Sequence, residues 1–290
     1  MPLTDLARLL NTHADTPHAG RRFANPFVAH ERGVEVVFAD LRLRTRFVPI
    51  VDTANGGPHG HAAALQVTGL ASRRALDPAA VFVFPADDGE FVYLDRLVRT
   101  LHALNYLTQH VRGNLLLKVH PRHVLSVPAD HGLAFEELLR GCGLLPRQVT
   151  LEIDGEGIDD EAHLRRAVAN YQSRGYGIAL ARFGHAGTDY SRIEALRPDI
   201  VKLAPALLAS GRPLGRLIGR LHDLGAKVMV EAVDTIALRR GAADSGIDLL
   251  QDSAVSHRAA TEPDPVAGGL VAAQRTMENP MRSCGSRLTS

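Results

Sequence analysis

Residues 176–193 read YGIALARFGHAGTDYSRI, and this segment begins as an apolar strand that ends at an arginine. A continuous apolar run, in contrast to an alternating one, is typical of a parallel strand that is buried on both faces. A charge at the end of such a strand costs free energy unless it is paired. We therefore expect Arg182 to contact a carboxylate or a ligand at the end of its strand.

Further short apolar runs (VTLEI, DIVKL and AKVMVE) alternate with helical patterns along most of the chain. The pattern predicts strands at residues 34–39, 45–51, 59–67, 114–119, 148–153, 176–182, 199–203, 226–230 and 247–251. It predicts helices at residues 91–109, 131–141, 160–174, 189–195, 213–224 and 234–243. This alternation indicates an α/β fold, and seven or eight such units in one domain favour a closed (β/α)8 barrel.

The chain divides into three expected parts. Residues 1–33 are an N-terminal lead-in with a short helix at TDLARLL, residues 34–258 form the barrel, and residues 259–290 form a flexible tail of small and polar residues. The two cysteines, Cys142 and Cys284, are too few for a disulfide framework. Cys142 lies in a helix C-terminal turn and is predicted to be packed rather than nucleophilic.

The composition excludes several classes of partner. With 33 Lys and Arg residues against 32 Asp and Glu residues, no overall field favours nucleic acid or a membrane surface. No apolar run reaches the length of a transmembrane helix, and the start lacks the pattern of a secretory signal. An aromatic content of 5% without Trp argues against a stacking platform for single-stranded nucleic acid. We expect a cytoplasmic protein with no nucleic-acid or membrane partner.

In barrels of this kind the functional groups lie at the carboxyl ends of the strands. Several predicted strands end in charged or polar residues, which we expect to meet across the mouth of the barrel. In chain order these residues are Lys118, Glu152, Arg182, Lys202, Glu231 and Gln251.

Eight motifs stand in the order and spacing of a known family. They are FVPIVD (residues 47–52), GHAAALQV (60–67), LLLKVHPRHVL, VTLEID, GYGIALARFG, RPDIVKLA, AKVMVEAVD and DLLQDSAVS. Together they resemble the EAL domain, a bacterial TIM-like (β/α)8 barrel that hydrolyses the second messenger cyclic di-GMP. The resemblance runs from residue 40 to residue 258. It implies two-metal hydrolysis of a phosphodiester, in which carboxylates hold divalent ions and a lysine helps to position the water.

The match to the family's functional positions is partial. The resemblance implies retained functional residues at Glu152, Lys202, Glu231 and Gln251. It implies replaced ones at Ala62, Lys118, Gly155, Ala181 and Arg182, where the family has the signature glutamate, an asparagine, a second glutamate and a pair of aspartates. Two positions that grip the dinucleotide in the family also differ, at Val48 and Gln66.

The replacements at Ala62, Lys118, Ala181 and Arg182 each make the site more positive, so the resemblance implies that the Mg²⁺ or Mn²⁺ site is lost and that no cofactor is bound. Without a metal ion, the water keeps a pKa about 9 units higher, which is worth about 12 kcal/mol. We expect a degenerate EAL-domain protein that is not an enzyme and acts as a regulatory or protein-interaction module in cyclic di-GMP signalling. An active phosphodiesterase is the least expected alternative.

Two interpretations of the new cations remain open. In the first, Arg182 and Lys118 are the counter-ions of Glu152 and Glu231, in place of metal ions. In the second, Lys118, Arg182 and Lys202 form an anion-binding cup, and the chain is a metal-free sensor of cyclic di-GMP or another nucleotide.

Two further features are weaker signals. The motifs PHGH and HPRH suggest a replacement metal site, although scattered histidines are more often surface or capping groups; the residues are His59, His61, His120 and His123. In the EAL family the loop after residue 184 couples nucleotide binding to dimer contacts. A homodimer formed through residues 184–196 is therefore a further expectation from the resemblance.

Overall fold

The computed structural model describes residues 5, 7, 8, 10, 11, 26–31, 33–109, 111–185, 188–209, 213–231 and 241–251, all within one compact unit, Met1–Ser253. The expected tail at 259–290 lies outside these residues, as does most of the helix expected at 234–243. The short N-terminal helix is described only in part.

Eight of the described strands close into a barrel, which confirms the predicted fold class. Around the barrel they follow the order β3–β11–β10–β9–β8–β7–β6–β4, and β4 pairs with β3. Strand β3 is antiparallel to both of its neighbours, and the remaining pairs are parallel. The strands are β3 (Leu41–Asp52), β4 (Pro58–Gly69), β6 (Asn114–Val119), β7 (Val149–Asp154), β8 (Gly177–Phe183), β9 (Ile200–Leu203), β10 (Lys227–Glu231) and β11 (Leu249–Gln251).

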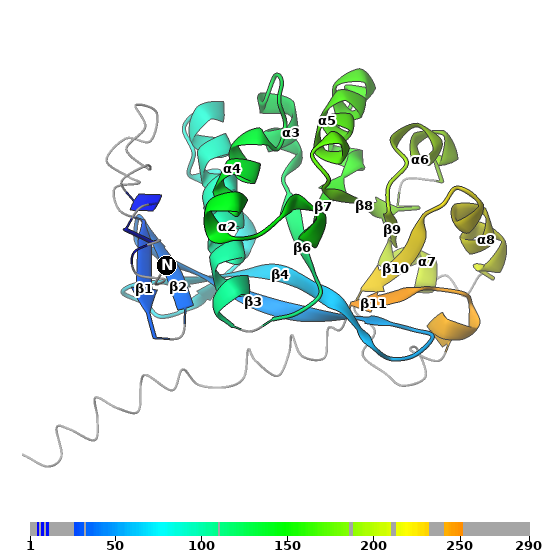
Figure 1. Cartoon of the computed structure of the whole chain (residues 1–290), viewed down its shortest axis with the longest axis horizontal. Coiled ribbons are helices and arrows are strands. Elements are labelled where there is room, and N and C mark those ends of the chain that lie inside the picture. The colour runs from blue at the N-terminus through cyan, green and yellow to red at the C-terminus, as the bar shows by residue number, and fades with distance from the viewer. Residues whose placement is uncertain are drawn as a thin grey trace, which may run out of the picture. The chain divides into compact units, whose positions relative to one another are not determined.

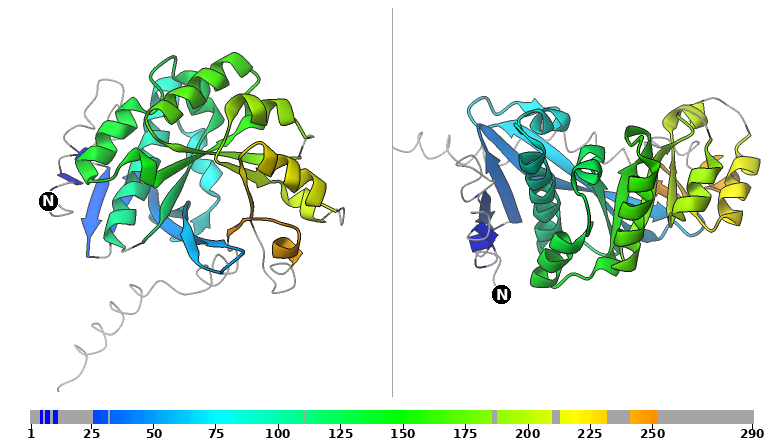
Figure 2. Two further views of the ribbon diagram at one scale, coloured as in Figure 1. Left: turned by 45° about the vertical axis from the view of Figure 1, so that its right-hand side comes forward. Right: turned by 90° about the horizontal axis from the view of Figure 1, so that it is seen from above.

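Helices form an arc around the outside of this sheet (Figures 1 and 2). They are α2 (Asp88–Thr108), α3 (Pro121–Ser126), α4 (Leu133–Cys142), α5 (Glu161–Ser173), α6 (Tyr190–Leu196), α7 (Pro205–Ala209) and α8 (Gly215–Asp223), with 3-10 turns η2 (Pro78–Val83), η3 (Pro146–Gln148) and η4 (Gly155–Gly157). Aspartates cap the first turns of several helices: Asp87 accepts from the Glu90 amide at α2, and Asp160 accepts from the His163 amide at α5. No helix among the described residues is long and apolar enough to cross a membrane.

Strand alternation divides the buried side chains between two sides of the sheet. One set fills the inside of the barrel and consists of Val48, Ile50, Ala62, Leu116, Ala179, Ile200, Met229 and Leu249. The neighbouring residues of the same strands, such as Leu117, Leu151 and Val228, pack outward in a larger core with the helices. Six of the eight barrel strands have seven residues or fewer, so each contributes few apolar side chains to the inside of the barrel. Polar side chains occupy the carboxyl ends of these strands.

The sheet also continues beyond the barrel. Strand β1 (Phe27–His30) pairs with β2 (Gly33–Phe38), and β2 pairs with the first residues of β3, while β5 (Ala75–Leu76) pairs with the end of β4. Strand β1 lies inside the segment that was expected to be a lead-in. The sequence did not predict this strand, because four residues are too few to give a periodic signal. The strand expected at 34–39 belongs to this extension and not to the barrel.

Candidate functional site

A cavity of about 640 Å³ opens where the parallel strands end, and we call this end the barrel mouth. The cavity brings together most of the residues that were singled out in the sequence. Among the residues that line it are Ala62, Lys118, Glu152, Ala181, Arg182, Lys202, Glu231 and Gln251. Gly155 instead lines a second cavity of about 430 Å³, beside the carboxyl end of β8. Arg182 lines both cavities.

Lys202, on β9, is the centre of the polar contacts in the barrel mouth. Its ammonium lies 3.0 Å from Glu152 Oε2 and donates to Gln251 Oε1 at 3.1 Å, and it also contacts the Glu231 carboxylate. The Lys202 side chain is only 4% exposed and that of Glu152 only 7%. The three N–H groups of the ammonium therefore have three oxygen acceptors, which is the condition for keeping a buried charge.

The pKa values of this cluster move in the direction that keeps it ionised. Burial alone would lower the pKa of Lys202, but the charges of Glu152 and Glu231 outweigh burial, and the pKa rises above 10.5. Burial would raise the pKa of Glu231, but the Lys202 charge and, more weakly, Lys118 bring it below 4.5. Both groups are charged at neutral pH.

Lys118, on β6, is the most exposed cation in the cluster. Its ammonium lies 3.9 Å from Glu152 Oε1, and 71% of its side chain is exposed. At this distance and exposure the pair contributes little to stability. Lys118 is therefore a counter-ion of Glu152 only in a weak sense, because the contact is long and screened by solvent.

Arg182 stands at an irregularity in β8. The register with β9 shifts between Leu180 and Phe183, and Arg182 has the left-handed backbone angle φ of 57°. Such a bulge redirects a side chain out of the regular alternation. The guanidinium of Arg182 lies 2.9 Å from Asp154 Oδ2 and 3.2 Å from Glu156 Oε2.

These contacts correct one expectation and limit another. The prediction that Arg182 pairs with Glu152 or Glu231 is wrong, because the bulge brings its guanidinium to the end of β7 and to η4 instead. In the expected anion-binding cup, Lys202 and Arg182 are both held by carboxylates, and Lys118 is the cation with most of its side chain in solvent.

The second cavity lies beside the start of α6. Arg192 of that helix donates to the Gly155 carbonyl at 2.8 Å and contacts the Glu161 carboxylate. Asp189 caps α6 by accepting from the Arg192 amide. These contacts connect α6 to the turn η4 that follows β7. That turn contains Gly155, the position where the resemblance implies that a glutamate of the family has been replaced.

The four histidines do not form one site. His61 is paired in register with Leu115, near the start of β6, and its ring contacts the Arg112 carbonyl at 3.1 Å. His120 follows the opposite end of β6. The ring of His120 stacks on Phe82 at 5.5 Å and caps α3. Among the described residues, no three His, Cys, Asp or Glu side chains lie close enough together to hold a metal ion.

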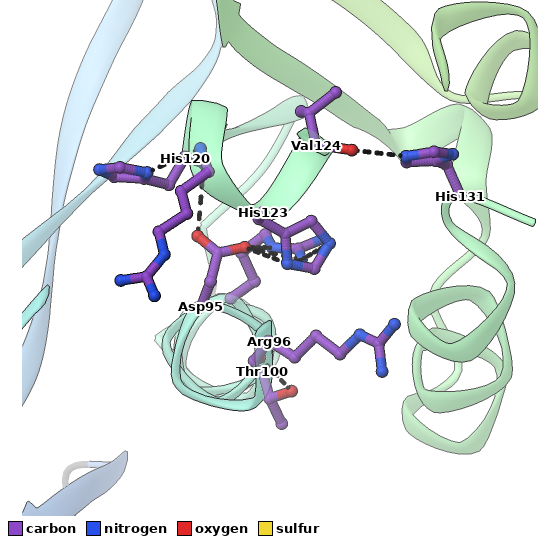
Figure 3. Close-up of polar contacts among 9 residues, drawn as sticks. Asp95, Arg96, Thr100, His120, His123, Val124 and His131 are labelled. Carbon is purple, nitrogen blue, oxygen red and sulfur yellow. Dashed lines mark hydrogen bonds and ion pairs between the residues drawn. The ribbon is translucent and has the colours of Figure 1, made fainter. Parts of the chain in front are cut away.

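A buried ionic cluster at the wall of the barrel mouth, where Asp95 lines the cavity, was missed in the sequence (Figure 3). Asp95 of α2 accepts from Arg99 at 2.8 Å, lies 3.1 Å from His123 Nδ1 and accepts weakly from the His120 amide at 3.4 Å. Burial raises the pKa of Asp95 against the Arg99 charge, and burial followed by the Arg99 charge lowers that of His123. The spacing of four residues between Asp95 and Arg99 was the signal that could have revealed this cluster.

The comparison with protein families assigns the chain to a known family. The model of the EAL domain matches residues 34–257, and the chain belongs to the EAL-domain family, the family of cyclic di-GMP phosphodiesterases. A comparison with curated proteins found no match.

Solved structures agree on the fold. BlrP1 from Klebsiella pneumoniae, in a calcium and cyclic di-GMP complex, has a TM-score of 0.62 and 20% identity, over 72% of this chain and 54% of that chain. A standalone EAL protein from Vibrio cholerae O395, in its cyclic di-GMP-bound form, has a TM-score of 0.60 and 19% identity, over 73% and 90%. The Bacillus subtilis YkuI protein, in complex with cyclic di-GMP and calcium, has a TM-score of 0.61 and 18% identity, over 73% and 54%. The chain spans about half the length of BlrP1 and YkuI.

Proposed function

We propose that this chain is a non-catalytic EAL-domain protein that acts as a regulatory, protein-interaction module in bacterial cyclic di-GMP signalling. The observation that supports this proposal is the lining of the barrel mouth, where Ala62 and Ala181 carry no carboxylate and Lys118 and Arg182 add cations near Glu152 and Glu231. Lys202 and Lys118 together match the two negative charges of Glu152 and Glu231, which weakens the attraction for a divalent cation.

The residues around this cluster are a poor match for Mg²⁺ or Mn²⁺. Mg²⁺ needs near-octahedral oxygen coordination at short distances. Ala62 and Ala181 offer no side-chain donor, and Lys118 and Arg182 add positive charge where a cation would have to approach. We therefore expect no metal-dependent hydrolysis at this site.

The energetic consequence is large. A metal-bound water has a pKa near 7 in the best cases and bulk water has one of about 15.7. The difference of about 9 units corresponds to about 12 kcal/mol of activation of the nucleophile. The carboxylates that line the cavity among the described residues are each engaged by a cation: Glu152 and Glu231 by Lys202, Asp154 by Arg182, and Asp95 by Arg99.

The direct test is hydrolysis of cyclic di-GMP in excess Mg²⁺ or Mn²⁺, with the linear dinucleotide as the measured product. The wild-type chain should form none. The matched control carries Ala62→Glu, Lys118→Asn, Ala181→Asp and Arg182→Asp, which restores four of the five replaced functional positions and should gain metal-dependent turnover. Metal-dependent turnover by the wild-type chain would exclude the proposal.

A second candidate function is metal-free binding of cyclic di-GMP. It is favoured by the exposed ammonium of Lys118 beside a cavity of about 640 Å³, which is within the size range of small-molecule sites. Calorimetric titration with cyclic di-GMP in EDTA tests it. Saturable binding that Lys118→Gln weakens would support the sensor. The control is Lys227→Gln, since Lys227 is exposed at the start of β10, at the opposite end of the barrel.

A further inference from the structure

The cavity of the barrel mouth continues to the outer side of strand β4. The pairing of β4 with β6 ends at Ala62 and Leu116, although both strands extend beyond this pair. The four consecutive residues 62–65 of β4 all line the cavity, and their side chains alternate between the two faces of the sheet. The cavity therefore reaches the outer face of β4, on the side where α2 packs against β3 and β6 (Figure 1). We call this outer part the side chamber, and its lining includes Leu65, Phe82, Asp95, Val98, His102 and Val119.

Helix α2 presents one face to the side chamber. Val98 and His102 follow Asp95 by three and seven residues, which places the three side chains on the same face of the helix. Apolar groups make up much of the remaining wall, including Leu65 of β4 and the ring of Phe82 in η2. The side chamber can therefore hold an apolar body, and an aromatic ring of a ligand can pack against Phe82. The whole cavity, about 640 Å³, is within the size range of small-molecule sites.

His102 brings an unused hydrogen-bonding atom to the side chamber. The residue is only 4% exposed, and its Nδ1 lies 2.8 Å from the hydroxyl of Thr45. Burial lowers the pKa of His102 to about 3, so the ring is neutral and one of its two nitrogens carries a proton. In the described part of the chain, Nε2 has no hydrogen-bond partner. Because Nδ1 is engaged by Thr45 and the residue lines the cavity, Nε2 is the ring nitrogen that is left for a ligand.

The neighbours of Thr45 indicate which nitrogen of His102 carries the proton. The amide of Asn105 is oriented by two hydrogen bonds with the backbone of Val34, and its Nδ2 also donates to Thr45 Oγ1 at 3.3 Å. The hydroxyl proton of Thr45 then has His102 Nδ1 as its acceptor. A proton on Nε2 satisfies this relay, so we assign the Nε2–H tautomer to His102. The side chamber is therefore offered a neutral N–H donor.

The charges around the side chamber determine which kind of acceptor fits. The Lys and Arg residues that line the cavity come from β6, β8 and β9 at the barrel mouth, and not from α2 or η2; they are Lys118, Arg182 and Lys202. An anionic group in the side chamber would lose its hydration beside Asp95 without gaining a cation. The carbonyl oxygen of a neutral ligand avoids this cost and can accept from a neutral imidazole.

We propose that the side chamber binds a small neutral molecule with an apolar body and a carbonyl oxygen, and that this oxygen accepts a hydrogen bond from His102 Nε2. The apolar body packs among Leu65, Val98 and the ring of Phe82, which favours a planar molecule such as an aromatic ketone. The inference goes beyond the proposed function, because it uses neither the ion cluster of Lys202 nor a metal ion. The two proposals can therefore fail separately.

The test compares two compounds of the same shape. The probe is acetylnaphthalene, a neutral planar ketone, and its matched control is isopropenylnaphthalene, in which a methylene group replaces the carbonyl oxygen. Equilibrium dialysis of each compound against the full chain gives the two affinities. The ketone should bind more tightly. Unspecific binding to an apolar surface would give the opposite order, because the control compound is the more apolar of the two.

Substitutions then locate the ketone in the side chamber. His102→Phe keeps a planar ring and removes the donor, so it should weaken ketone binding by roughly threefold to tenfold, as expected for one hydrogen bond. It should leave the affinity for isopropenylnaphthalene unchanged. Ala79→Phe adds bulk at an exposed position of the cavity lining, three residues before Phe82, and should weaken binding of both compounds. The control His61→Phe lies near the start of β6, at the opposite end of the barrel, and should change neither affinity.

Three results would overturn the proposal. One is a ketone affinity no higher than that of the control compound, which includes no saturable binding of either. Another is unchanged ketone binding in a His102→Phe chain that thermal melting shows to be folded. The third is a loss in Lys118→Gln as large as that in His102→Phe, which would place the ketone in the barrel mouth. If His102→Phe does not fold, Ala79→Phe decides, and unchanged ketone binding in that variant contradicts the proposal.

Discussion

Replacement of Lys202 by methionine is the most informative perturbation of the barrel mouth. The substitution keeps most of the side-chain volume and removes the ammonium that contacts Glu152, Glu231 and Gln251. Glu152, only 7% exposed, is then left with the long contact to Lys118 at 3.9 Å. Removal of one partner from a buried ion pair costs about 3–5 kcal/mol. We expect the free energy of unfolding of Lys202→Met to fall by this amount.

The assay is urea unfolding near neutral pH, analysed for the midpoint and for the slope. The matched control is the triple variant Lys202→Met, Glu152→Gln, Glu231→Gln, in which no buried charge is left unpaired. The triple variant should recover most of the loss. A fall in the free energy of unfolding of less than about 1 kcal/mol in Lys202→Met is the range of an exposed pair and would exclude a buried ion pair at Lys202. An equal loss in the triple variant would exclude it as well.

The same cluster predicts a pH window. The pKa of Lys202 is raised in the folded chain, so its stabilisation is fully present below 10.5 and is lost as the pH rises through the folded value. The pKa of Glu231 is lowered, so its stabilisation is present above 4.5 and is lost as the pH falls through the folded value. Unfolding of Lys202→Met should show a shallower alkaline loss than the wild-type chain, while the loss that comes from buried groups such as Cys142 remains. An unchanged alkaline limb would contradict this assignment.

Three further predictions concern single residues. Arg182→Ala should cost about 1 kcal/mol in urea unfolding, because the arginine is half exposed and water screens its ion pairs. Arg182→Gly should cost less, since glycine accepts the positive φ freely. A loss above about 3 kcal/mol for alanine would show a buried pair. Burial lowers the pKa of His102 to about 3, so the free energy of unfolding should fall by up to about 1.4 kcal/mol for each pH unit below 6.5. His102→Gln should flatten this slope, and an unchanged slope would contradict the assignment to His102. Burial raises the pKa of the Cys142 thiol to about 11, so in a Cys284→Ser background iodoacetamide should react slowly until urea unfolds the chain; rapid reaction of the folded chain would exclude a packed cysteine.

The sequence predicted the barrel well because its strands are continuous apolar runs with clear helical patterns between them. It also predicted that Lys118, Glu152, Lys202 and Glu231 would gather at the strand ends, since parallel strands share one edge. Both conclusions depend on periodicity and order along the chain, which a single sequence contains.

The partner of Arg182 could not be predicted in the same way. A bulge changes the direction of one side chain without leaving a periodic signal, and here it moves the guanidinium from Glu152 and Glu231 to Asp154 and Glu156. The cluster of Asp95 with His123 was missed for a related reason. Its members lie on different helices, and only their packing at the wall of the barrel mouth brings them together.

We propose that Lys202 and Lys118, in place of a metal ion, balance the charges of Glu152 and Glu231 in the barrel mouth. Titration of the wild-type chain with Mn²⁺, followed by the loss of the free-ion electron paramagnetic resonance signal, tests this claim most directly. We expect no saturable binding by the wild-type chain, and binding by the variant that carries Ala62→Glu, Lys118→Asn, Ala181→Asp and Arg182→Asp. Saturable binding of Mn²⁺ by the wild-type chain, abolished by Glu152→Gln, would contradict it.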